Sequence, residues 1–465
     1  MKVELLGNYD KNELVNRIRK IATAGKLSRF PGTVFEAYES TEDFDKSLGL
    51  VKRIIGMGHK SIIEHDYLVF AMSNISPIVE QTLIGYRLTS FTIKSRREVN
   101  FKNVGYYIPT FRNINGEIHE KNDEITKKYI SHMDFLFDTY QKLVDQGIDI
   151  EDARFILPYS YHSNLVMGLD ARELEQIICA FKYSYLNKIS ELKELGEILY
   201  NTVKEQLPYL IEGIDNHELN LRTGFEDLDK KISKPEIKII PKTQLINYTK
   251  NADDTILLSY IMYHYQCPIE TAKEILETLD RNEIMQTILH KNERRELEQV
   301  SFTFQIPISL AMLTHLTRHR MHSLLVPEFT PLWNIANFEI PLNIKNNDTA
   351  NKFFTEAANK NVDMLKEFKT YNIFEEDLIY FYLSAQQCNV ITTLNGKSAQ
   401  WICRMRCCSK TQSQTRIIAN EFAKQIKEVA PLLGKGLGPT CITDHICNEG
   451  KESCGLINKI LENEK

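Results

Sequence analysis

The sequence repeats itself over most of its length, and this repetition limits the possible architectures more than any other feature. The stretch SPIVEQTLIGYRLTS, which begins at Ser76, aligns without a gap with SLAMLTHLTRHRMHS, which begins at Ser309. Three identical pairs share the offset of this alignment: Ser76 and Ser309, Arg87 and Arg320, Ser90 and Ser323. Two later matches share a slightly smaller offset: EDARFIL at Glu151 with EDLIYFY at Glu376, and LDARELEQII at Leu169 with LNGKSAQWIC at Leu394. Because these matches follow one another in the same order in both halves of the chain, they predict an internal duplication whose repeat unit is a whole domain.

Each half carries the same succession of predicted elements. The alternating apolar runs YLVFAM from Tyr67 and SFTFQI from Ser301 each predict a strand before the aligned stretch. Apolar residues recur at helical spacing over Ile125–Asp145 and Ala350–Lys369. Each half is predicted to have helices, then strands, then a helix that leads into the arginine-containing motif, and then further helices. This order predicts an α+β fold. We expect an antiparallel or mixed sheet with helices in each half.

The division between the halves is expected near Glu212–Ile240. This segment is polar, carries the turn formers Gly, Asp and Pro, and lacks a long periodic run. A length of 465 residues fits more than one domain. We therefore expect a first domain at residues 1–220, a second at 221–435 and a cysteine-rich tail at 436–465.

The composition excludes some classes of function. Hydrophobic residues make up 43% of the chain and charged residues 26%, with a net charge of -5. This balance is ordinary for a soluble globular protein and argues against a general basic surface that coats nucleic acid or membranes. No apolar run reaches the roughly 18–20 residues of a membrane helix, and the opening MKVELLGNYDKNEL lacks a secretory hydrophobic segment. We expect a cytoplasmic protein that binds neither nucleic acid nor membranes.

Polar motifs stand at corresponding places in the two halves. The first half has GHKSIIEH over Gly58–His65, then GYRLTSFTIKSRREVNF from Gly85, then Arg154 in DARFILP. The second half has Arg-His-Arg at Arg318–Arg320 and a late helix in which Arg406 follows an asparagine by eleven residues. This set resembles flavin-dependent thymidylate synthases (the ThyX-like family), whose pattern is G-H-x-S-x-x-E-H, R-H-R-x-x-S-x-x-x-x-S-x-R, Arg-x-x-Leu-Pro and an Asn-x-Arg helix. The resemblance covers most of both halves and implies two tandem copies of that family's domain.

Compared with the family pattern, the two halves have lost residues at different places. The first half keeps His59, Ser61, Glu64, Arg87, Ser90, Ser95, Arg97 and Arg154. It departs from the pattern at Gly85, Tyr86, Asp170 and Phe181. The second half keeps Arg318, His319, Arg320, Ser323, Asn395, Arg406, Gln412 and Arg416, with Lys397 in place of an arginine, and departs at Glu328, Thr330 and Ile379. Because the family builds each site from several subunits, the resemblance implies one composite type of site that both halves complete.

The resemblance also implies a role for each retained residue. The catalytic residues would be Arg406 and His59. The substrate-binding residues would be Arg87, Ser95, Arg97, Arg154 and Arg406, and the FAD-binding residues Ser61, Glu64, Arg318, His319, Arg320, Asn395 and Lys397. The planar fork of arginine suits both a nucleotide phosphate and the pyrophosphate of FAD. A glycine-rich dinucleotide loop is not evident in the sequence.

The implied reaction makes dTMP from dUMP. Methylenetetrahydrofolate would donate the one-carbon unit and reduced FAD the hydride, with NAD(P)H or another reductant reducing the flavin. The tetramers of the family imply a homodimer of this two-domain chain. Two alternatives stay open: flavin-dependent modification of another pyrimidine nucleotide, and a catalytically silent protein that binds a nucleotide or flavin.

The cysteines are gathered near the end of the chain. Seven of the nine lie between Cys388 and Cys454. In a reducing compartment such a cluster indicates a metal site or reactive thiols more often than disulfides. The expected ligands of a zinc ion or an iron–sulfur cluster are Cys408, Cys441, Cys447 and Cys454. The spacing is not that of a C-x-x-C pair, and free thiols are the alternative.

Overall fold

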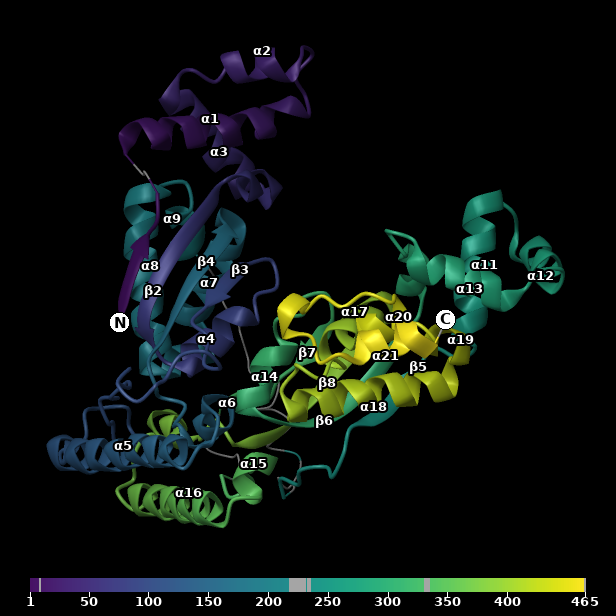
Figure 1. Ribbon diagram of the computed structural model, residues 1–465. Helices are drawn as coiled ribbons and strands as arrows, with labels where there is room; N and C mark the ends of the chain where they lie inside the picture. Colours follow the sequence, from purple (N-terminus) through teal and green to yellow (C-terminus); the bar gives the residue numbers. More distant parts are fainter. Residues whose placement is uncertain (8–9, 217–230, 232–235, 330–334, 464–465) are drawn as a thin grey trace. The chain divides into compact units, whose positions relative to one another are not determined.

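The computed structural model describes residues 1–7, 10–216, 231, 236–329 and 335–463 (Figure 1). The chain forms two compact units, and neither is continuous in sequence. Unit 1 comprises Met1–Ile237, Phe329–Ala336 and Leu342–Ser384, and unit 2 comprises Lys238–Glu328, Asn337–Pro341 and Ala385–Lys465. Part of the second sequence half therefore folds into the same compact body as the first. Among the described residues, no helix is both long enough and apolar enough to cross a membrane.

The helices and strands of unit 1 come from both sequence halves. From the first half it has β1 (Lys2–Leu5), α1 (Lys11–Leu27), α2 (Val34–Glu39), α3 (Phe44–Gly56), η1 (Lys60–His65), β2 (Tyr67–Ile75), α4 (Pro77–Ile84), β3 (Ser90–Ile93), α5 (Asn122–Asp145), α6 (Ile150–Ala153), η2 (Arg154–Ile156), β4 (Ser163–Asp170), α7 (Ala171–Tyr183), η3 (Tyr185–Lys188), α8 (Ser190–Gln206) and α9 (Ile211–Asp215). From the second half it has α15 (Leu342–Lys345), α16 (Asp348–Lys369), η5 (Glu375–Asp377) and η6 (Ile379–Phe381).

The elements of unit 2 all belong to the second half. They are β5 (Gln244–Tyr248), α11 (Ala252–Tyr265), α12 (Ile269–Glu277), α13 (Arg281–His290), η4 (Arg295–Gln299), β6 (Ser301–Ser309), α14 (Leu310–Leu316), β7 (Ser323–Leu325), β8 (Gln387–Asn395), α17 (Gly396–Arg406), α18 (Ser413–Val429), α19 (Pro431–Gly434), α20 (Thr440–Thr443), η7 (Gly450–Glu452) and α21 (Leu456–Asn463). The helices predicted from periodicity are α5 and α16, and both are confirmed with starts two or three residues earlier than expected.

Each unit contains a four-stranded antiparallel sheet, and the two sheets share one strand order. The order is β1-β2-β4-β3 in the first and β5-β6-β8-β7 in the second. The strands predicted from YLVFAM and SFTFQI are β2 and β6, and each is central in its sheet. The shared order confirms the α+β prediction and the duplication.

One extra residue in the first half shifts the alignment of the two copies between the start of the central strand and the helix that follows it. The segment from the start of β2 at Tyr67 to Ser76 is one residue longer than the equivalent segment from Ser301 to Ser309. The extra residue is absorbed at a bulge around Asn74, where the register between β2 and β4 shifts. Asn74 has a φ of 57°, which asparagine tolerates better than most residues, and its N–H donates to Asn164 Oδ1 at 3.3 Å.

Alternation along the central strands builds the core of each unit. The buried residues of β2 include Leu68, Phe70 and Met72, and those of β6 include Phe302, Phe304 and Ile306. In unit 2, Phe422 of α18 packs on Phe304 with the ring centroids 4.6 Å apart. Burying such a side chain contributes about 1.5–3 kcal/mol. The buried face also holds the register, because a slip of one residue would turn all these side chains outward.

Unit 1 contains an internal pseudo-twofold contact between equivalent segments of the two halves. Helix α5 packs against its counterpart α16. The N–H of Tyr159 donates to the carbonyl of Tyr382, and the N–H of Ser384 donates to the carbonyl of Leu157 at 2.8 Å. Tyr382 and Ser384 are the repeat equivalents of Leu157 and Tyr159, in the alignment that pairs EDARFIL with EDLIYFY. The two hydrogen bonds are therefore the reciprocal pair that a twofold axis produces.

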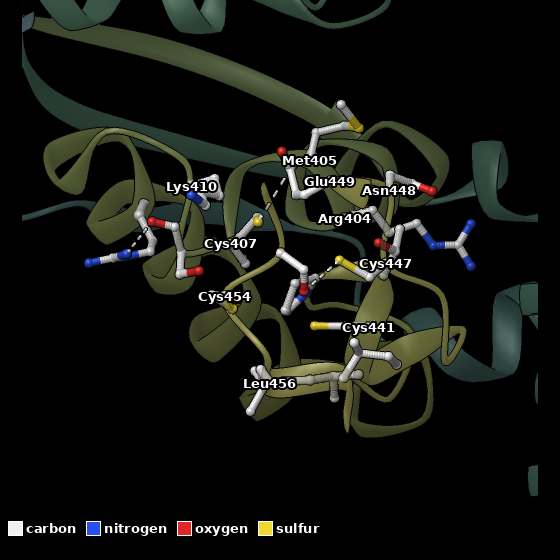
Figure 2. Close-up of a pocket in the computed structure, with 18 of the residues that line it drawn as sticks. Arg404, Met405, Cys407, Lys410, Cys441, Cys447, Asn448, Glu449, Cys454 and Leu456 are labelled. Carbon is white, nitrogen blue, oxygen red and sulfur yellow. Dashed lines mark hydrogen bonds between the residues drawn. The ribbon is translucent and has the colours of Figure 1, made fainter. Parts of the chain in front are cut away.

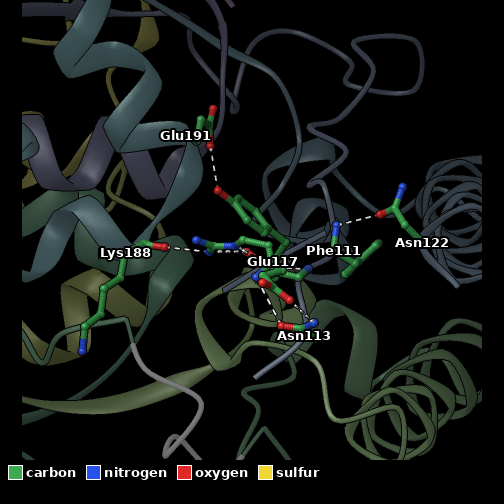
Figure 3. A network of polar contacts seen from close by, with 9 residues as sticks. Phe111, Asn113, Glu117, Asn122, Lys188 and Glu191 are labelled. Atoms are coloured by element: carbon green, nitrogen blue, oxygen red, sulfur yellow. Dashed lines mark hydrogen bonds and ion pairs between the residues drawn. The ribbon is translucent and has the colours of Figure 1, made fainter. Parts of the chain in front are cut away.

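A buried ion pair also joins the two sequence halves inside unit 1. Arg112 donates through Nη2 to Asp377 Oδ1 at 2.6 Å and through Nε to Oδ2 at 3.0 Å, and its backbone N–H donates to Oδ2 at 2.9 Å. The Asp377 side chain is only 1% exposed. Arg112 also donates to the carbonyl of Lys188 at 2.7 Å, and Figure 3 shows this contact beside the bond that Glu191 accepts from Tyr380.

His132 of α5 is a buried titratable group in the same interface. It is 2% exposed and stacks on the rings of Phe135 and Phe381. Its Nε2 lies 2.8 Å from Asn361 Oδ1, and the Asn361 amide donates to the Phe381 carbonyl at 2.8 Å. Because Oδ1 only accepts, Nε2 carries the imidazole proton. Burial lowers the pKa of His132 to about 4.

We expect a His132→Gln variant to lose part of the acid sensitivity of the protein. Since the folded-state pKa lies below the unfolded value of about 6.5, the unfolded chain binds more protons between pH 6.5 and 4. Stability therefore falls as the pH falls through that window, by roughly 2 kcal/mol more in the wild type than in the variant between about pH 7 and 4.5. Burial raises the pKa of Glu191 to about 7, so this residue makes stability rise as the pH falls. Its contribution is the same in the wild type and the variant and does not affect their difference. Denaturant titrations at about pH 7 and 4.5 measure the free energy of unfolding of both proteins. An equal loss of stability in the wild type and the variant would contradict the prediction.

Candidate active site

Three of the residues expected to bind a nucleotide phosphate come together in unit 1. Ser95 and Arg97 follow β3, and Arg154 begins η2; we call these three residues the arginine cluster. Arg97 Nε donates to the carboxylate of Glu151 at 2.5 Å, and Arg154 Nε donates to the carbonyl of the same residue at 3.0 Å. Ser95 Oγ accepts from the N–H of Arg97 at 3.3 Å. Glu151, the first residue of the repeated EDARFIL segment, connects the two arginines.

The electrostatics of the arginine cluster favour an anionic ligand. Arg154 is 3% exposed. Burial lowers its pKa to about 10, and the positive charges of Arg96 and Arg97 contribute to the lowering. An anion placed beside these guanidinium groups relieves both the burial penalty and the repulsion. A phosphate monoester carries two charges and matches the bidentate geometry of arginine.

The G-H-x-S-x-x-E-H residues lie on the exposed side of η1. His59, Ser61 and Glu64 are not buried, whereas the isoleucines between them point into the core. Glu64 pairs with Arg172 of α7 at 2.5 Å. Lys60 pairs with Glu175 of the same helix at 2.9 Å. These two contacts hold η1 against α7.

The arginine cluster and the η1 residues lie at opposite ends of one sheet. η1 precedes Tyr67, the first residue of β2, whereas the cluster adjoins the end of β3 at which Ile93 pairs with Leu165 of β4. Leu165 also pairs with Met72, so five residues of β2, roughly 17 Å of strand, lie between this end of β3 and Tyr67.

Arg87 lies at the η1 end of the sheet rather than with the arginine cluster. It is exposed in the turn between α4 and β3. Ser90, where β3 begins, pairs with Gly168 near the end of β4, and Ser95 follows the opposite end of β3. The four residues of β3, roughly 13 Å of strand, separate Arg87 from the cluster.

In unit 2, Arg318–Arg320 form a turn that lies along α17; we call this segment the RHR turn. Arg406 Nε donates to His319 Nε2 at 3.0 Å, which joins the end of α17 to the turn. Ser398 Oγ donates to the carbonyl of Met321 at 3.2 Å, which joins the first turn of α17 to the residue after the RHR turn. The structure thus brings Arg406 and the RHR turn together.

His319 is neutral at physiological pH. Burial lowers its pKa to about 3, and the charge of Arg406 adds to the lowering. Because Arg406 Nε–H donates to Nε2, the imidazole proton is on Nδ1. His319 therefore offers one uncharged N–H donor between two cationic side chains.

Asn395 and Lys397 stand at the other end of α17 from Arg406. Asn395 is the N-cap, and its Oδ1 accepts from the N–H of Ser398 at 2.7 Å. Lys397 pairs with Glu298 of η4 at 2.8 Å. The cap satisfies one of the free N–H groups at the positive end of the helix dipole.

Sequence reasoning missed two charged residues that take part in equivalent pairs. Glu298 precedes β6 by the same distance at which Glu64 precedes β2, and Lys397 aligns with Arg172 in the match that begins at Leu394 and Leu169. The pairs Glu64–Arg172 and Glu298–Lys397 are thus the same contact in the two halves. The repeat itself is the sequence signal that could have identified Arg172 and Glu298. Aligning the two halves pairs Arg172 with Lys397 and Glu298 with Glu64, at positions of the family pattern.

Where a half has lost an arginine of the family pattern, the replacement residues in the described part of the chain are uncharged. Phe181, at the position of Arg406, and Ile379, at the position of Arg154, are both fully buried. Gly85 ends α4 at the position of Arg318. Thr330, at the position of Arg97, lies outside the described residues.

The four cysteines expected to bind a metal line one pocket of about 360 Å³ in unit 2, which Figure 2 shows. The lining thiols include Cys408, Cys441, Cys447 and Cys454. However, the described residues contain no group of three or more His, Cys, Asp or Glu that could hold a metal ion. The thiol of Cys408 contacts Glu449 at 3.9 Å, that of Cys447 contacts Ser453 at 3.4 Å, and Cys454 is exposed. The structure therefore does not support the expected zinc or iron–sulfur site.

Comparison with known proteins identifies relatives over both halves. The family model described as "Thymidylate synthase complementing protein" (Thy1) matches residues 13–209 and 244–432. The flavin-dependent thymidylate synthase of Thermococcus onnurineus is 31% identical over 182 residues, which cover 38% of this chain and 69% of the relative. That of Clostridium tetani is 28% identical over 235 residues, 46% of this chain and 93% of the relative. The ThyX structure from Helicobacter pylori with FAD and dUMP aligns with a TM-score of 0.35 and 19% identity over 46% of this chain and 99% of that one.

Proposed function

Because this chain belongs to the Thy1 family, with one match in each sequence half, we propose that it methylates dUMP to dTMP in a flavin-dependent reaction. Methylenetetrahydrofolate is the one-carbon donor, and NAD(P)H or a similar reductant reduces the flavin. The relatives from Thermococcus onnurineus and Clostridium tetani both carry the name flavin-dependent thymidylate synthase. The proposal assigns to this chain the activity that their names state.

The observation that carries the proposal is the division of the charged residues between the two halves. The arginine cluster belongs to the first half, and the RHR turn with Arg406 belongs to the second. At the equivalent positions the other half has Phe181 and Ile379, which are buried and apolar. The two halves would therefore contribute complementary residues to one type of site. The placement of η1 and the arginine cluster at opposite ends of one sheet supports a site that is not completed within one copy.

The residues of unit 2 fit the charge distribution of FAD. The guanidinium groups of Arg318 and Arg320 suit a pyrophosphate, and the neutral His319 adds an N–H donor without further charge. The N-terminus of α17, capped by Asn395, presents the positive end of a helix. When bound, FAD would supply the hydride for the methyl group. We assign Ser61, Glu64 and Lys397 to the same ligand as hydrogen-bonding and charged groups.

The arginine cluster fits the phosphate of dUMP. Ser95 and Arg97 present a hydroxyl and a guanidinium on one turn, and Arg154 adds a buried charge whose pKa an anion would restore. Arg406 would stabilise the negative charge that develops on the uracil ring. His59, at the start of η1, would hydrogen-bond at the reacting end of the site. The protein's contribution is alignment and electrostatic stabilisation, and the cofactors carry the bond-making chemistry.

The chain is further proposed to form a homodimer. Two chains contain four copies of the domain, and closed twofold dimers are the commonest soluble assemblies. The reciprocal hydrogen bonds between Leu157–Tyr159 and Tyr382–Ser384 supply one pseudo-twofold relation inside a single chain. A dimer would add a second, true twofold relation between chains.

The proposed reaction is tested with purified protein and with cells. Expression should let a thymidine-requiring bacterial strain without thymidylate synthase grow on medium lacking thymidine. The purified protein should be yellow and should convert dUMP to dTMP with methylenetetrahydrofolate and NADPH. Product from UMP or dCMP but not from dUMP would indicate a different pyrimidine substrate. Bound flavin and nucleotide without any methylated product would indicate a silent binding protein.

A further inference from the structure

A buried ion pair lies next to the arginine cluster. Arg96 is the central residue of the Ser95–Arg97 segment, and its guanidinium pairs with the carboxylate of Glu80 on α4. The two side chains are 6% and 1% exposed. Arg96 also hydrogen-bonds the hydroxyl of Tyr161, and the second oxygen of Glu80 accepts from Ser163 Oγ. The guanidinium between Ser95 and Arg97 is thus anchored to α4 and to the segment that enters β4.

This anchoring limits the conformations of the Ser95–Arg97 turn. The turn is further closed by the bond from the N–H of Arg97 to Ser95 Oγ. With Arg96 held in the core, the backbone on either side of it cannot rotate without breaking a buried ion pair. Folding itself does not require such a pair, because apolar residues of similar size are often as stable at such positions.

The second sequence half lacks the pair. Leu313 and Phe329 are the equivalents of Glu80 and Arg96 in the alignment that pairs Ser76 with Ser309. Leu313 is fully buried in α14, so an apolar residue at this place is compatible with the fold. The same half also lacks the Ser-x-Arg residues of the motif. The ion pair therefore accompanies the phosphate-binding residues and not the fold.

We infer that Glu80 and Arg96 form a positioning pair that holds Ser95 and Arg97 in the geometry that receives a phosphate monoester. The inference rests on the proposed function in one respect, namely that the arginine cluster binds the phosphate of a nucleotide. Neither member of the pair contacts the nucleotide. The pair as a whole is electrically neutral, and the contribution that we infer is to geometry, in addition to the positive charge that Arg96 places near Arg154.

A Glu80→Gln variant separates positioning from charge. If only charge mattered, removing a carboxylate near the cluster would raise its positive potential and strengthen phosphate binding. If the pair positions the turn, the freed Arg96 weakens binding instead. We expect dissociation constants for dUMP and for inorganic phosphate about ten- to hundredfold higher than in the wild type. Binding of deoxyuridine, which has no phosphate, should not change. Calorimetry on the FAD-loaded full chain measures all three ligands.

Two further variants control for folding. Glu191→Gln is the matched control, because Glu191 is also a buried carboxylate and contacts Ser76, the N-cap of the same helix α4. It should bind dUMP as the wild type does. The double variant Glu80→Leu with Arg96→Met removes both charges, keeps the site apolar and should fold. It should still show the selective loss of phosphate affinity.

The outcomes decide the inference in either direction. Unchanged or stronger phosphate binding in Glu80→Gln and in the double variant would overturn it. Equal weakening of dUMP and deoxyuridine would also overturn it, because that pattern means a general loss of the site. If the wild-type protein binds inorganic phosphate but not dUMP, the proposed function is rejected. In that case, weaker phosphate binding in Glu80→Gln would still support the positioning role of the Glu80–Arg96 pair. Wild-type protein that binds neither would reject both.

Discussion

Arg97→Ala is expected to weaken dUMP binding by roughly one to three orders of magnitude and to leave FAD bound, whereas Arg318→Ala is expected to do the reverse. Removing a bidentate arginine from a desolvated phosphate site costs about 2–5 kcal/mol of binding free energy. Arg97 belongs to the cluster around Glu151 in unit 1, and Arg318 to the RHR turn in unit 2. Flavin absorbance after gel filtration and calorimetry with dUMP measure the two affinities. Both variants should lose turnover.

The repeat provides positional controls for this prediction. Thr330→Ala and Gly85→Ala change the positions equivalent to Arg97 and Arg318 in the other half, and both should leave the two affinities nearly unchanged. At Gly85 an added Cβ would lie 3.1 Å from the Thr82 carbonyl, a tight contact at a helix end that requires only a small shift. Loss of activity in these controls, together with full activity in Arg97→Ala and Arg318→Ala, would reject the shared site.

Mixing the two inactive arginine variants tests where the site is completed. If halves of different chains complete a site, random mixed dimers should regain part of the activity. If halves of one chain complete it, the mixture should stay inactive. Light scattering on the same samples shows whether dimers form, and a fully active monomer would contradict the proposed assembly.

Asp377→Ala is expected to lower the free energy of unfolding by about 3–5 kcal/mol. The substitution leaves the guanidinium of Arg112, whose side chain is 16% exposed, without its buried carboxylate. It also removes the acceptor of the Arg112 backbone N–H. Since the pair joins segments from the two sequence halves, unit 1 should lose cooperativity as well as stability. Denaturant titration followed by circular dichroism measures the change.

The control for Asp377→Ala is Asp363→Ala, which removes a side chain of the same type from α16. Asp363 is 74% exposed and pairs with Lys366 on the helix surface, so its removal should change stability by less than about 0.5 kcal/mol. The double variant Arg112→Met with Asp377→Leu should recover part of the loss, because no buried charge is left unpaired. A loss below about 1 kcal/mol in Asp377→Ala would show that solvent compensates the freed arginine.

The sequence alone established the architecture of each copy. Alternation at YLVFAM and SFTFQI located the central strands, and helical periodicity located α5 and α16. The constant offsets between matching stretches revealed the duplication, and the identical strand orders confirm it. These features are readable because burial of one face imposes a local period of two on a strand and of about 3.6 on a helix.

The candidate site was only partly readable. The motif spacing identified Arg97, Arg154 and Arg406, and the structure places each of them in a polar cluster. Spacing did not show that Arg96 turns inward to Glu80 while Arg97 turns toward Glu151. Adjacent arginines have the same local signal, and their directions depend on which carboxylate lies within reach in the folded chain.

The tertiary structure alone decided which segments share a core and which side chains converge. The apolar face of α16 shows that it must be buried, but its period does not say that its partner is α5, a helix from the other half of the sequence. Likewise, the cysteines near the end of the chain suggest a metal site, whereas the described residues contain no group of His, Cys, Asp or Glu that could hold a metal ion. Local periodicity reports which face of an element is buried. Partner choice and convergence depend on long-range contacts, which form only when distant parts of the chain come together.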